Sequence, residues 1–254
     1  MNILEVTGLS KEYKGGTKAL TDVNFSVKEG EFVSIIGPSG AGKSTLLRCI
    51  NKMIDATEGE IKFDGVSVKS LNKKELRKHR TKIGMIFQHY NLVNRLSVVE
   101  NILHGRLGYK STISGVLGIY NEEEKKQAFQ IINKLGLNEQ AYKRCDELSG
   151  GQKQRVGVAR ALIQNPKALL CDEPISSLDP NSSKIIMDHL KRINKEMGIT
   201  CIFNLHQVDV AVKYSDKIIG VNGGRVIFDG KPEELTKDKI HEIYGSEVGE
   251  LITD

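Results

Sequence analysis

The sequence predicts an α/β protein built around a parallel β-sheet, and three observations support this fold class. Residues 168–171 and 200–205 are continuous apolar runs, which are typical of strands covered on both faces, and helical segments alternate with them. Short alternating stretches near the N-terminus predict a separate antiparallel β part. From about residue 91 to residue 145 the apolar period becomes helical, which indicates an inserted helical part.

The N-terminal part is expected to form short, twisted strands at residues 3–6, 19–27 and 61–68. In the last of these, apolar residues alternate on both sides of Asp64-Gly65, a pair that favours a tight turn. The pattern therefore predicts a hairpin. Residues 31–36 form a further predicted strand that runs directly into a glycine-rich loop.

The inserted helical part carries recognisable helix starts. Ser97 and Glu100 have the spacing of a capping box, and Asn121 precedes three glutamates, which favour the positive end of a helix. Gly136 is expected to end the helix that follows Asn121. Residues 108–120 are rich in glycine and serine and show no clear period, so they form either a loop over a binding groove or a surface connection.

Composition limits the class of protein. The chain has 254 residues, of which 39% are hydrophobic, so it can bury a full core and is not disordered. No apolar run approaches the ~20 residues that span a bilayer, and the N-terminus does not resemble a signal peptide. If the chain serves transport, other chains must form the pore. Its four scattered cysteines fit reduced thiols in the cytosol.

Binding of nucleic acid is not expected. The net charge of +5 is mild, and no stripe of lysine and arginine interleaved with aromatic residues is present. The charge is compatible with a position near an anionic membrane face, and a solvated surface explains it equally well.

The strongest motif is the phosphate-binding loop at residues 37–44, which matches G-x-x-x-x-G-K-[ST] in full between a predicted strand and a predicted helix. Its glycines let successive N–H groups point at phosphate oxygens, and the helix adds its positive end. Lys43 is expected to reach the β- and γ-phosphates of ATP, and Ser44 to ligate Mg²⁺. The expected nucleotide contacts are Gly37, Pro38, Ser39, Gly40, Ala41, Gly42, Lys43, Ser44 and Thr45.

Two acids stand at the end of the strand at residues 168–171, where ligand sites gather in α/β sheets. Asp172 is expected to hold Mg²⁺ through water, and Glu173 to act as general base on the attacking water. A polar strand end before a turn at Pro174 is the alternative. The complete phosphate-binding loop favours the catalytic interpretation.

Residues 148–152, Leu-Ser-Gly-Gly-Gln, start another helix, because Ser149 and Gln152 have capping-box spacing. Gly150 and Gly151 expose bare N–H donors, which suit a γ-phosphate. A plain helix cap with a flexible approach is the alternative.

Four further residues are weak signals when taken alone. Gln88 and His206 each follow an apolar strand, and polar side chains at such positions are more often satisfied caps than catalytic groups. Asp179 comes shortly after Glu173. Tyr13 is either a half-buried strand tyrosine or an aromatic platform for a base.

The order of these motifs, with residues 148–152 ahead of the second acidic strand, resembles the ATP-binding-cassette ATPases from end to end. The resemblance implies a P-loop NTPase (RecA-like) core with an N-terminal antiparallel β subdomain and an inserted α-helical subdomain. It implies one domain, with residues 1–90 and 153–254 forming the β subdomain and core, and residues 91–152 forming the helical signature subdomain.

The resemblance also assigns roles to the weak signals. Gln88 becomes the Q-loop residue that touches Mg²⁺ or water and reports nucleotide occupancy to a transmembrane partner. His206 becomes the switch histidine that contacts the γ-phosphate and orients Glu173 and water. Asp179 belongs to the D-loop, and Tyr13 stacks on adenine.

A head-to-tail homodimer is implied in the same way, in which residues 149–152 of each chain complete the other chain's site. Departures from the family pattern are Lys153, Cys171 and Ser177, and none of them removes a catalytic group.

The cargo is indicated by a closer resemblance, to the ATPase subunits of phosphonate importers, carried by residues 87–93, 95–101, 105–108, 173–179, 205–209 and 243–245. It implies transmembrane permease subunits, an extracytoplasmic solute-binding protein and a peripheral position at the cytoplasmic face of the inner membrane. A phosphate or amino-acid importer, or a lipid-handling exporter, would share every catalytic motif. A soluble cassette of DNA repair or translation would usually carry two cassettes or a long coiled coil, and a non-hydrolysing module would lack Glu173 or His206.

Overall fold

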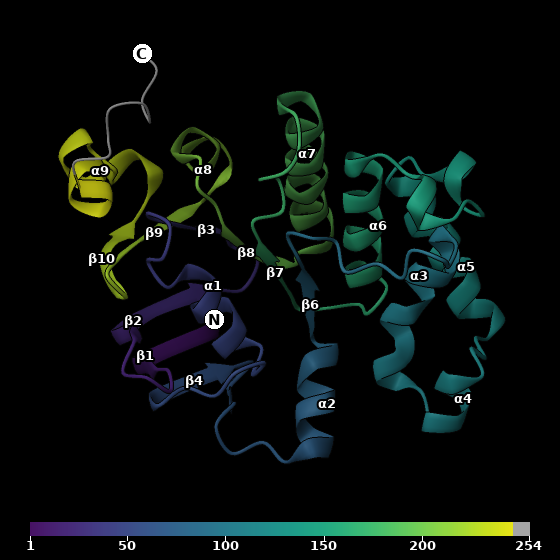
Figure 1. Cartoon of the computed structure of the whole chain (residues 1–254), viewed down its shortest axis with the longest axis horizontal. Helices are drawn as coiled ribbons and strands as arrows, with labels where there is room; N and C mark the ends of the chain where they lie inside the picture. The colour runs from purple at the N-terminus through teal and green to yellow at the C-terminus, as the bar shows by residue number, and fades with distance from the viewer. Residues whose placement is uncertain (246–254) are drawn as a thin grey trace. The chain divides into compact units, whose positions relative to one another are not determined.

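The computed structural model describes residues 1–245 and divides the chain into two compact units (Figure 1). The first unit comprises Met1–Leu76 and the chain from Ile193 onward, and the second comprises Arg77–Arg192. The chain crosses from one unit to the other within α2 (Lys73–Thr81) and α7 (Pro180–Met197). Residues 246–254 lie outside the described residues.

The first unit contains the predicted antiparallel β part (Figure 1). Its strand order is β2-β1-β4-β5, with β1 (Asn2–Glu12), β2 (Lys18–Lys28), β4 (Glu58–Phe63) and β5 (Val66–Ser67). The hairpin predicted around Asp64-Gly65 is confirmed, since Phe63 pairs with Val66. Both turn residues have positive φ, +52° and +72°, the backbone form that suits the twist of a two-residue hairpin.

A second sheet in this unit carries the strand that leads into the phosphate-binding loop. Its strand order is β10-β9-β3-β8, with β3 (Phe32–Ile36), β8 (Thr200–Asn204), β9 (Lys217–Asn222) and β10 (Arg225–Gly230). β3 runs parallel to both β8 and β9, and every residue of β3 and β8 is buried. The prediction of doubly covered parallel strands is therefore confirmed for this part.

Helices cover this sheet. They are α1 (Lys43–Ile50), α8 (Val208–Tyr214) and α9 (Lys237–Tyr244), with the short 3-10 turn η4 (Pro232–Glu234) before α9. α1 contacts β8 and also β2 of the antiparallel sheet, so the core of the unit lies between the two sheets around this helix. α9 packs on β9 and β10.

The second unit combines two parallel strands with a helical bundle. β6 (Ile83–Ile86) pairs with β7 (Ala168–Asp172), and the main helices α3 (Val98–Leu103), α5 (Glu122–Lys134) and α6 (Gly150–Leu162) pack on one another. The short elements are η1 (His104–Tyr109), α4 (Thr112–Val116), η2 (Asn138–Gln140) and η3 (Cys145–Glu147).

The predicted helix starts are confirmed. Ser97, Asn121 and Ser149 each form a complete capping box at the start of α3, α5 and α6. Gly136 follows α5 with φ +63°, as expected for a glycine that ends a helix. All four cysteines are buried free thiols, in agreement with the expectation of reduced cysteines. Within residues 1–245, no helix combines the length and apolar character that crossing a membrane requires.

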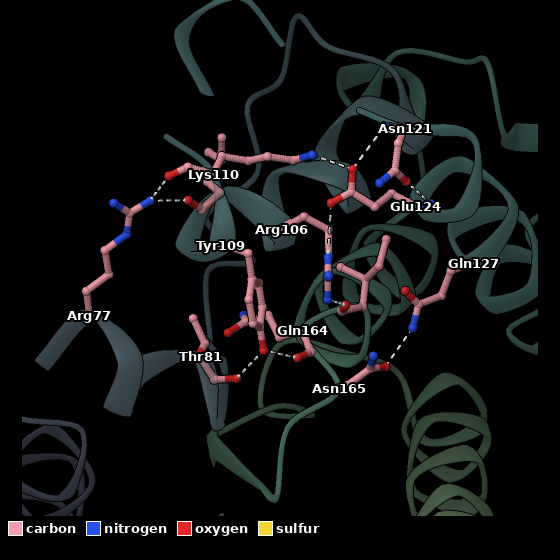
Figure 2. Close-up of polar contacts among 12 residues, drawn as sticks. Arg77, Thr81, Arg106, Tyr109, Lys110, Asn121, Glu124, Gln127, Gln164 and Asn165 are labelled. Carbon is pink, nitrogen blue, oxygen red and sulfur yellow. Dashed lines mark hydrogen bonds and ion pairs between the residues drawn. The ribbon is translucent and has the colours of Figure 1, made fainter. Parts of the chain in front are cut away.

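Residues 108–120, which show no period in the sequence, contain the end of η1 and the helix α4. The chain on either side of α4 is held in place by polar contacts with other segments of the same unit, rather than by a stripe of buried apolar side chains (Figure 2). Tyr109 donates to the Gln164 carbonyl at 2.7 Å, and Arg77 donates to the carbonyls of Leu107 and Lys110. These contacts join distant parts of the sequence, so no local sequence pattern predicts them.

Glu124 is the centre of this network (Figure 2). Its carboxylate is buried, accepts hydrogen bonds from Lys110 and from Arg106 (3.4 Å), and accepts the Asn121 N–H of its own capping box at 3.0 Å. Burial by itself would raise the pKa of Glu124, but the hydrogen bonds from Lys110 and Asn121 and the charge of Lys110 outweigh it, so the pKa lies below its ordinary value.

Replacement of this carboxylate tests the network. Glu124→Gln keeps the shape of the side chain but removes its charge, so Lys110 and Arg106 lose their charged acceptor. We expect the free energy of unfolding at pH 7 to fall by about 1.5–3 kcal/mol. Because the folded pKa is depressed, the contribution is present above the ordinary carboxyl pKa and is lost as pH falls through the folded value.

Chemical denaturation followed by circular dichroism, from pH 7 to well below the ordinary carboxyl pKa, measures both effects. Glu122→Gln is the matched control, since Glu122 lies on the same helix, is exposed and pairs with Lys125 at the surface. Equal losses of stability in the two variants would contradict the assignment.

Candidate nucleotide-binding and catalytic site

The phosphate-binding loop joins β3 to α1, as the sequence predicts. Gly42 is the N-cap of α1 and has φ +101°, and Gly37 and Gly40 also have positive φ. α1 starts at Lys43, so the positive end of the helix faces the loop. The local geometry therefore presents backbone N–H groups at a helix N-terminus, which is the arrangement that binds phosphate.

Close packing fixes both ends of this loop. A Cβ on Gly37 would lie 1.9 Å from the Val221 carbonyl oxygen, and a Cβ on Gly42 would lie 2.3 Å from the Ala19 carbonyl oxygen. At Gly40, in the middle, a Cβ would meet nothing within 4 Å. The loop is thus clamped by β9 and β2 at its ends and open at its centre, where a phosphate could approach the backbone.

The charged and hydroxyl side chains of the loop are also held in place. Lys43 is buried, and its ammonium donates to the carbonyl oxygens of Gly37 at 2.7 Å and Pro38 at 2.8 Å. The Ser44 hydroxyl accepts a hydrogen bond from the Asn204 amide at 3.0 Å. Lys43 therefore lies along the inside of the loop, and Asn204 orients Ser44.

The Ser44 hydroxyl oxygen of this loop fits a Mg²⁺ ion that is bound together with a nucleotide. No cluster of three or more His, Cys, Asp or Glu side chains that could hold a metal is found among residues 1–245. Magnesium in phosphate-transfer sites is usually held by one or two protein oxygens together with phosphate oxygens and water. The oriented Ser44 hydroxyl at the helix start supplies such an oxygen.

His206 follows β8, which runs parallel to β3, with Ile35 opposite Asn204. The two strands therefore deliver His206 and the phosphate-binding loop to the same edge of the sheet. The Tyr244 hydroxyl connects them, since it accepts the Gly37 N–H at 3.2 Å and donates to the His206 carbonyl at 3.4 Å. Burial raises the pKa of Tyr244 to about 12, so the hydroxyl keeps its proton at neutral pH and remains a donor.

Tyr13 lies beside the start of α1. Its hydroxyl is 3.3 Å from the Thr45 hydroxyl, the residue is 40% exposed, and the Lys11 ammonium lies over the ring, 5.3 Å from its centre. A partly exposed ring whose hydroxyl is held in place can stack on a base. The structure thus places Tyr13 and Thr45, two of the predicted nucleotide contacts, next to each other.

The second unit carries the predicted acids and Gln88. β6 and β7 are parallel, with Ile86 opposite Cys171, so Gln88 and Glu173 leave the same edge of this strand pair. Asp172 is buried at the end of β7. Glu173 has φ +50°, which is uncommon for a residue other than glycine and often marks a functional position.

The same unit holds the signature residues 149–152 and the D-loop around Asp179. The Ser149 hydroxyl accepts the Gln152 N–H at 3.3 Å, as the capping spacing predicts. The Asp179 carboxylate accepts the Ser182 N–H at 3.0 Å at the start of α7, and hydrogen bonds from Ser182 lower its pKa. A Cβ on Gly151 would lie 3.2 Å from the Ser182 hydroxyl, so the signature and the start of α7 are neighbours.

The predicted site residues thus form two sets, one in each unit. The first unit groups the phosphate-binding loop with Thr45, Tyr13 and His206. The second groups Gln88, Asp172 and Glu173 with the signature and Asp179.

Two residues in contact with the first set are not predicted as site residues. Asn204 lies inside the run at residues 200–205 that the sequence analysis treats as apolar. A polar residue in such a run, close to a strand end, was the feature that could have identified Asn204 as a site residue. Tyr244 enters the sequence analysis only within residues 243–245, which carry the resemblance to phosphonate-importer subunits, and not as a site residue. It follows the phosphate-binding loop by about 200 positions, so no spacing rule connects the two.

The strand, glycine-rich loop and helix, with acids at the end of a parallel strand, define a P-loop nucleoside triphosphatase. The chain belongs to the ABC transporter family, whose model matches residues 20–176. It is an ATP-binding cassette, the ATP-hydrolysing component of such transporters.

Its relatives include proteins named as importer subunits. It is 62% identical over 253 residues to "Phosphonates import ATP-binding protein PhnC 2" of Oceanobacillus iheyensis, covering 100% of both chains. It is 52% identical over 239 residues to "Phosphonates import ATP-binding protein PhnC" of Treponema denticola, covering 94% of this chain and 93% of the other.

Solved structures of cassettes share the fold. The ADP form of MJ1267, an ATP-binding cassette of an ABC transporter, is 32% identical with a TM-score of 0.84, covering 96% of this chain and 98% of the other. The dimeric post-hydrolysis state of MJ0796, bound to ADP and phosphate, is 38% identical with a TM-score of 0.79, covering 90% and 98%. The predicted fold class is therefore confirmed.

The Tyr244 bridge can be tested by removal of one oxygen atom. Tyr244→Phe leaves the Gly37 N–H without its acceptor in a buried position, so we expect the free energy of unfolding to fall by about 1–3 kcal/mol. The dissociation constant for ATP should rise, because the loop is less well ordered before binding. Denaturation and titration with a fluorescent ATP analogue measure the two effects, and the exposed Tyr142→Phe is the control. Unchanged ATP affinity would contradict a role for the bridge in ordering the loop.

Proposed function

We propose that this chain is the ATP-hydrolysing subunit of a bacterial importer that takes up phosphonates through a separate permease. The observation that carries the proposal is the 62% identity, across the whole of both chains, to a protein named for phosphonate import. The loop geometry around Lys43 and the acids after β7 support the ATP chemistry on which such an importer depends.

In this proposal the loop residues 37–45 bind the phosphates of ATP, with Lys43 turning from the loop carbonyls toward the β- and γ-phosphates. Ser44 and Asp172, with Gln88, would hold Mg²⁺, which when bound neutralises charge on the phosphates. Tyr13 stacks on the adenine.

Glu173 acts as general base on the attacking water. It directly follows Asp172 at the strand end, which places its carboxylate beside the proposed Mg²⁺ site. The positive φ of Glu173 supports this role, since such a backbone form aims a side chain in a direction that a regular strand would not allow. His206 contacts the γ-phosphate and orients Glu173 and the water. The Tyr244 hydroxyl holds this histidine in place by donating a hydrogen bond to the His206 carbonyl.

The active form is proposed to be a head-to-tail homodimer with two composite sites. The capping box at Ser149 and the two glycines that follow it expose N–H donors at the start of α6, which is a ready site for a phosphate. In the dimer these donors, with Asp179 nearby, close over the ATP of the other chain. The dimeric form of the related MJ0796 cassette supports this arrangement.

The transport partners are two kinds of protein. Permease subunits would form the membrane path, and an extracytoplasmic solute-binding protein would deliver the phosphonate. The chain would then sit peripherally at the cytoplasmic face of the inner membrane.

Glu173→Gln tests the catalytic assignment. We expect the variant to bind ATP, to lose turnover by a factor of about 100 or more, and to accumulate as an ATP-bound dimer, because closure no longer leads to hydrolysis. Phosphate release and size-exclusion chromatography with Mg-ATP measure both effects. Glu139→Gln, at an exposed acid outside the proposed site in the same unit, is the control. A wild-type rate in Glu173→Gln would remove the general-base role.

The cargo is tested in vesicles that contain the chain, its permease and its binding protein. We expect methylphosphonate or aminoethylphosphonate to stimulate ATP hydrolysis several-fold over the basal rate, and equal concentrations of amino acids to have no effect. Stimulation by inorganic phosphate alone, or by amino acids alone, would favour a different importer and would leave the ATPase assignment intact.

A further inference from the structure

The turn after Gln88 has an unusual backbone that one side chain holds in place. Tyr90 and Asn91 are consecutive residues with positive φ, +59° and +48°, although neither is glycine. The Arg160 guanidinium donates to the carbonyl of Tyr90 at 2.7 Å and to the carbonyl of Asn91. Arg160 belongs to α6, the helix that begins within the signature residues 149–152. These two hydrogen bonds therefore hold the turn against α6.

The Tyr90 side chain reaches back to the start of the same helix. A Cβ on Gly157 would lie 3.9 Å from the Tyr90 carbonyl oxygen, whereas a Cβ on Gly150 would lie 3.2 Å from its hydroxyl. Gly150, Gln154 and Gly157 are spaced by four and three residues, so they share one face of α6. Gln154, between the two glycines, is completely buried. Tyr90 therefore runs along this face, and the glycines make room for it.

The Tyr90 hydroxyl also contacts the segment before α7. It lies 3.4 Å from the Ser177 hydroxyl, which is longer than a typical hydrogen bond between two hydroxyl groups and makes this a weak polar contact. A Cβ on Gly150 would lie 3.4 Å from Leu178. One hydroxyl thus stands where the turn after Gln88, the signature glycine and the D-loop come together.

We propose that Tyr90 is a positioning residue for ATP hydrolysis, which through its contact with Ser177 holds the signature and the D-loop in a fixed arrangement with the turn after Gln88. The inference rests on the proposed roles of these three segments. Tyr90 would not touch the nucleotide. Its effect would reach the reaction through the placement of the Gly150 and Gly151 N–H donors and of Asp179.

Loss of the Tyr90 hydroxyl should therefore affect ATP binding and ATP hydrolysis differently. Most of the proposed nucleotide contacts of a single chain, the phosphate-binding loop, Thr45 and Tyr13, belong to the other unit, so removal of the Tyr90 hydroxyl should change the affinity of a single chain for ATP much less than it changes turnover. Turnover needs the signature and D-loop donors in the correct place, so it should fall. A general loss of structure would instead weaken both.

A double-mutant cycle tests the inference. We expect Tyr90→Phe and Ser177→Ala each to lower kcat by about three- to tenfold, the range that corresponds to loss of one hydrogen bond. The double variant should be no slower than the slower single variant, because both changes remove the same contact. Phosphate release measures kcat, and a fluorescent ATP analogue measures the dissociation constant, since the chain has no tryptophan.

Tyr142→Phe, at an exposed tyrosine of the same unit, is the matched control and should keep the wild-type kcat. If Tyr90→Phe proves unstable in thermal denaturation, Ser177→Ala decides the question, because Ser177 is exposed. Unchanged kcat in Ser177→Ala, multiplicative losses in the double variant, or an equal loss of ATP affinity would each overturn the inference.

These outcomes are separate from a failure of the proposed function. A wild-type chain without ATPase activity, or an active Glu173→Gln variant, would count against the proposed function. An active wild type in which Tyr90 and Ser177 act independently would count against this inference alone.

Discussion

The phosphate-binding loop depends on backbone packing at Gly37 and Gly42 that no other residue type permits. A Cβ at either position would lie within 2.3 Å of a carbonyl oxygen, of Val221 in one case and of Ala19 in the other. These carbonyls belong to different β-sheets, so the loop is held between them and its centre stays open. Lys43 and Ser44 then take positions fixed by the loop carbonyls and by Asn204. The other candidate site residues of the first unit are arranged around this fixed loop.

Parallel strands explain why the remaining candidate residues gather. β3 and β8 end at the same edge and bring the phosphate-binding loop near His206, and β6 and β7 do the same for Gln88 and Glu173. The strands bring these segments close together, and the hydroxyl groups of two tyrosines then make polar contacts between them. Tyr244 joins the loop to the His206 carbonyl in the first unit, and Tyr90 meets Ser177 in the second. Each unit therefore has its own tyrosine at the junction of its functional segments.

Much of the fold follows from local rules. The three capping boxes and the hairpin at Asp64-Gly65 were predictable, because each depends on residues within four positions of one another. The helices α2 and α4 were not predicted, since α2 is mostly charged and α4 lies in a segment without a period. The surroundings of α4 are stabilised by the contacts of Arg77 and Glu124, which connect positions 14 to 33 residues apart.

The sequence by itself determined the class of protein and the identity of the motifs, because residues 37–44 and 148–152 act through short-range backbone geometry that their own residues specify. It also identified Asp172 and Glu173, since both directly follow an apolar strand. Only the tertiary structure decided which side chains support these motifs. Asn204, Tyr244 and Arg160 act on backbone or hydroxyl groups far away in the chain, and such contacts arise from the packing of strands and helices rather than from any spacing along the sequence.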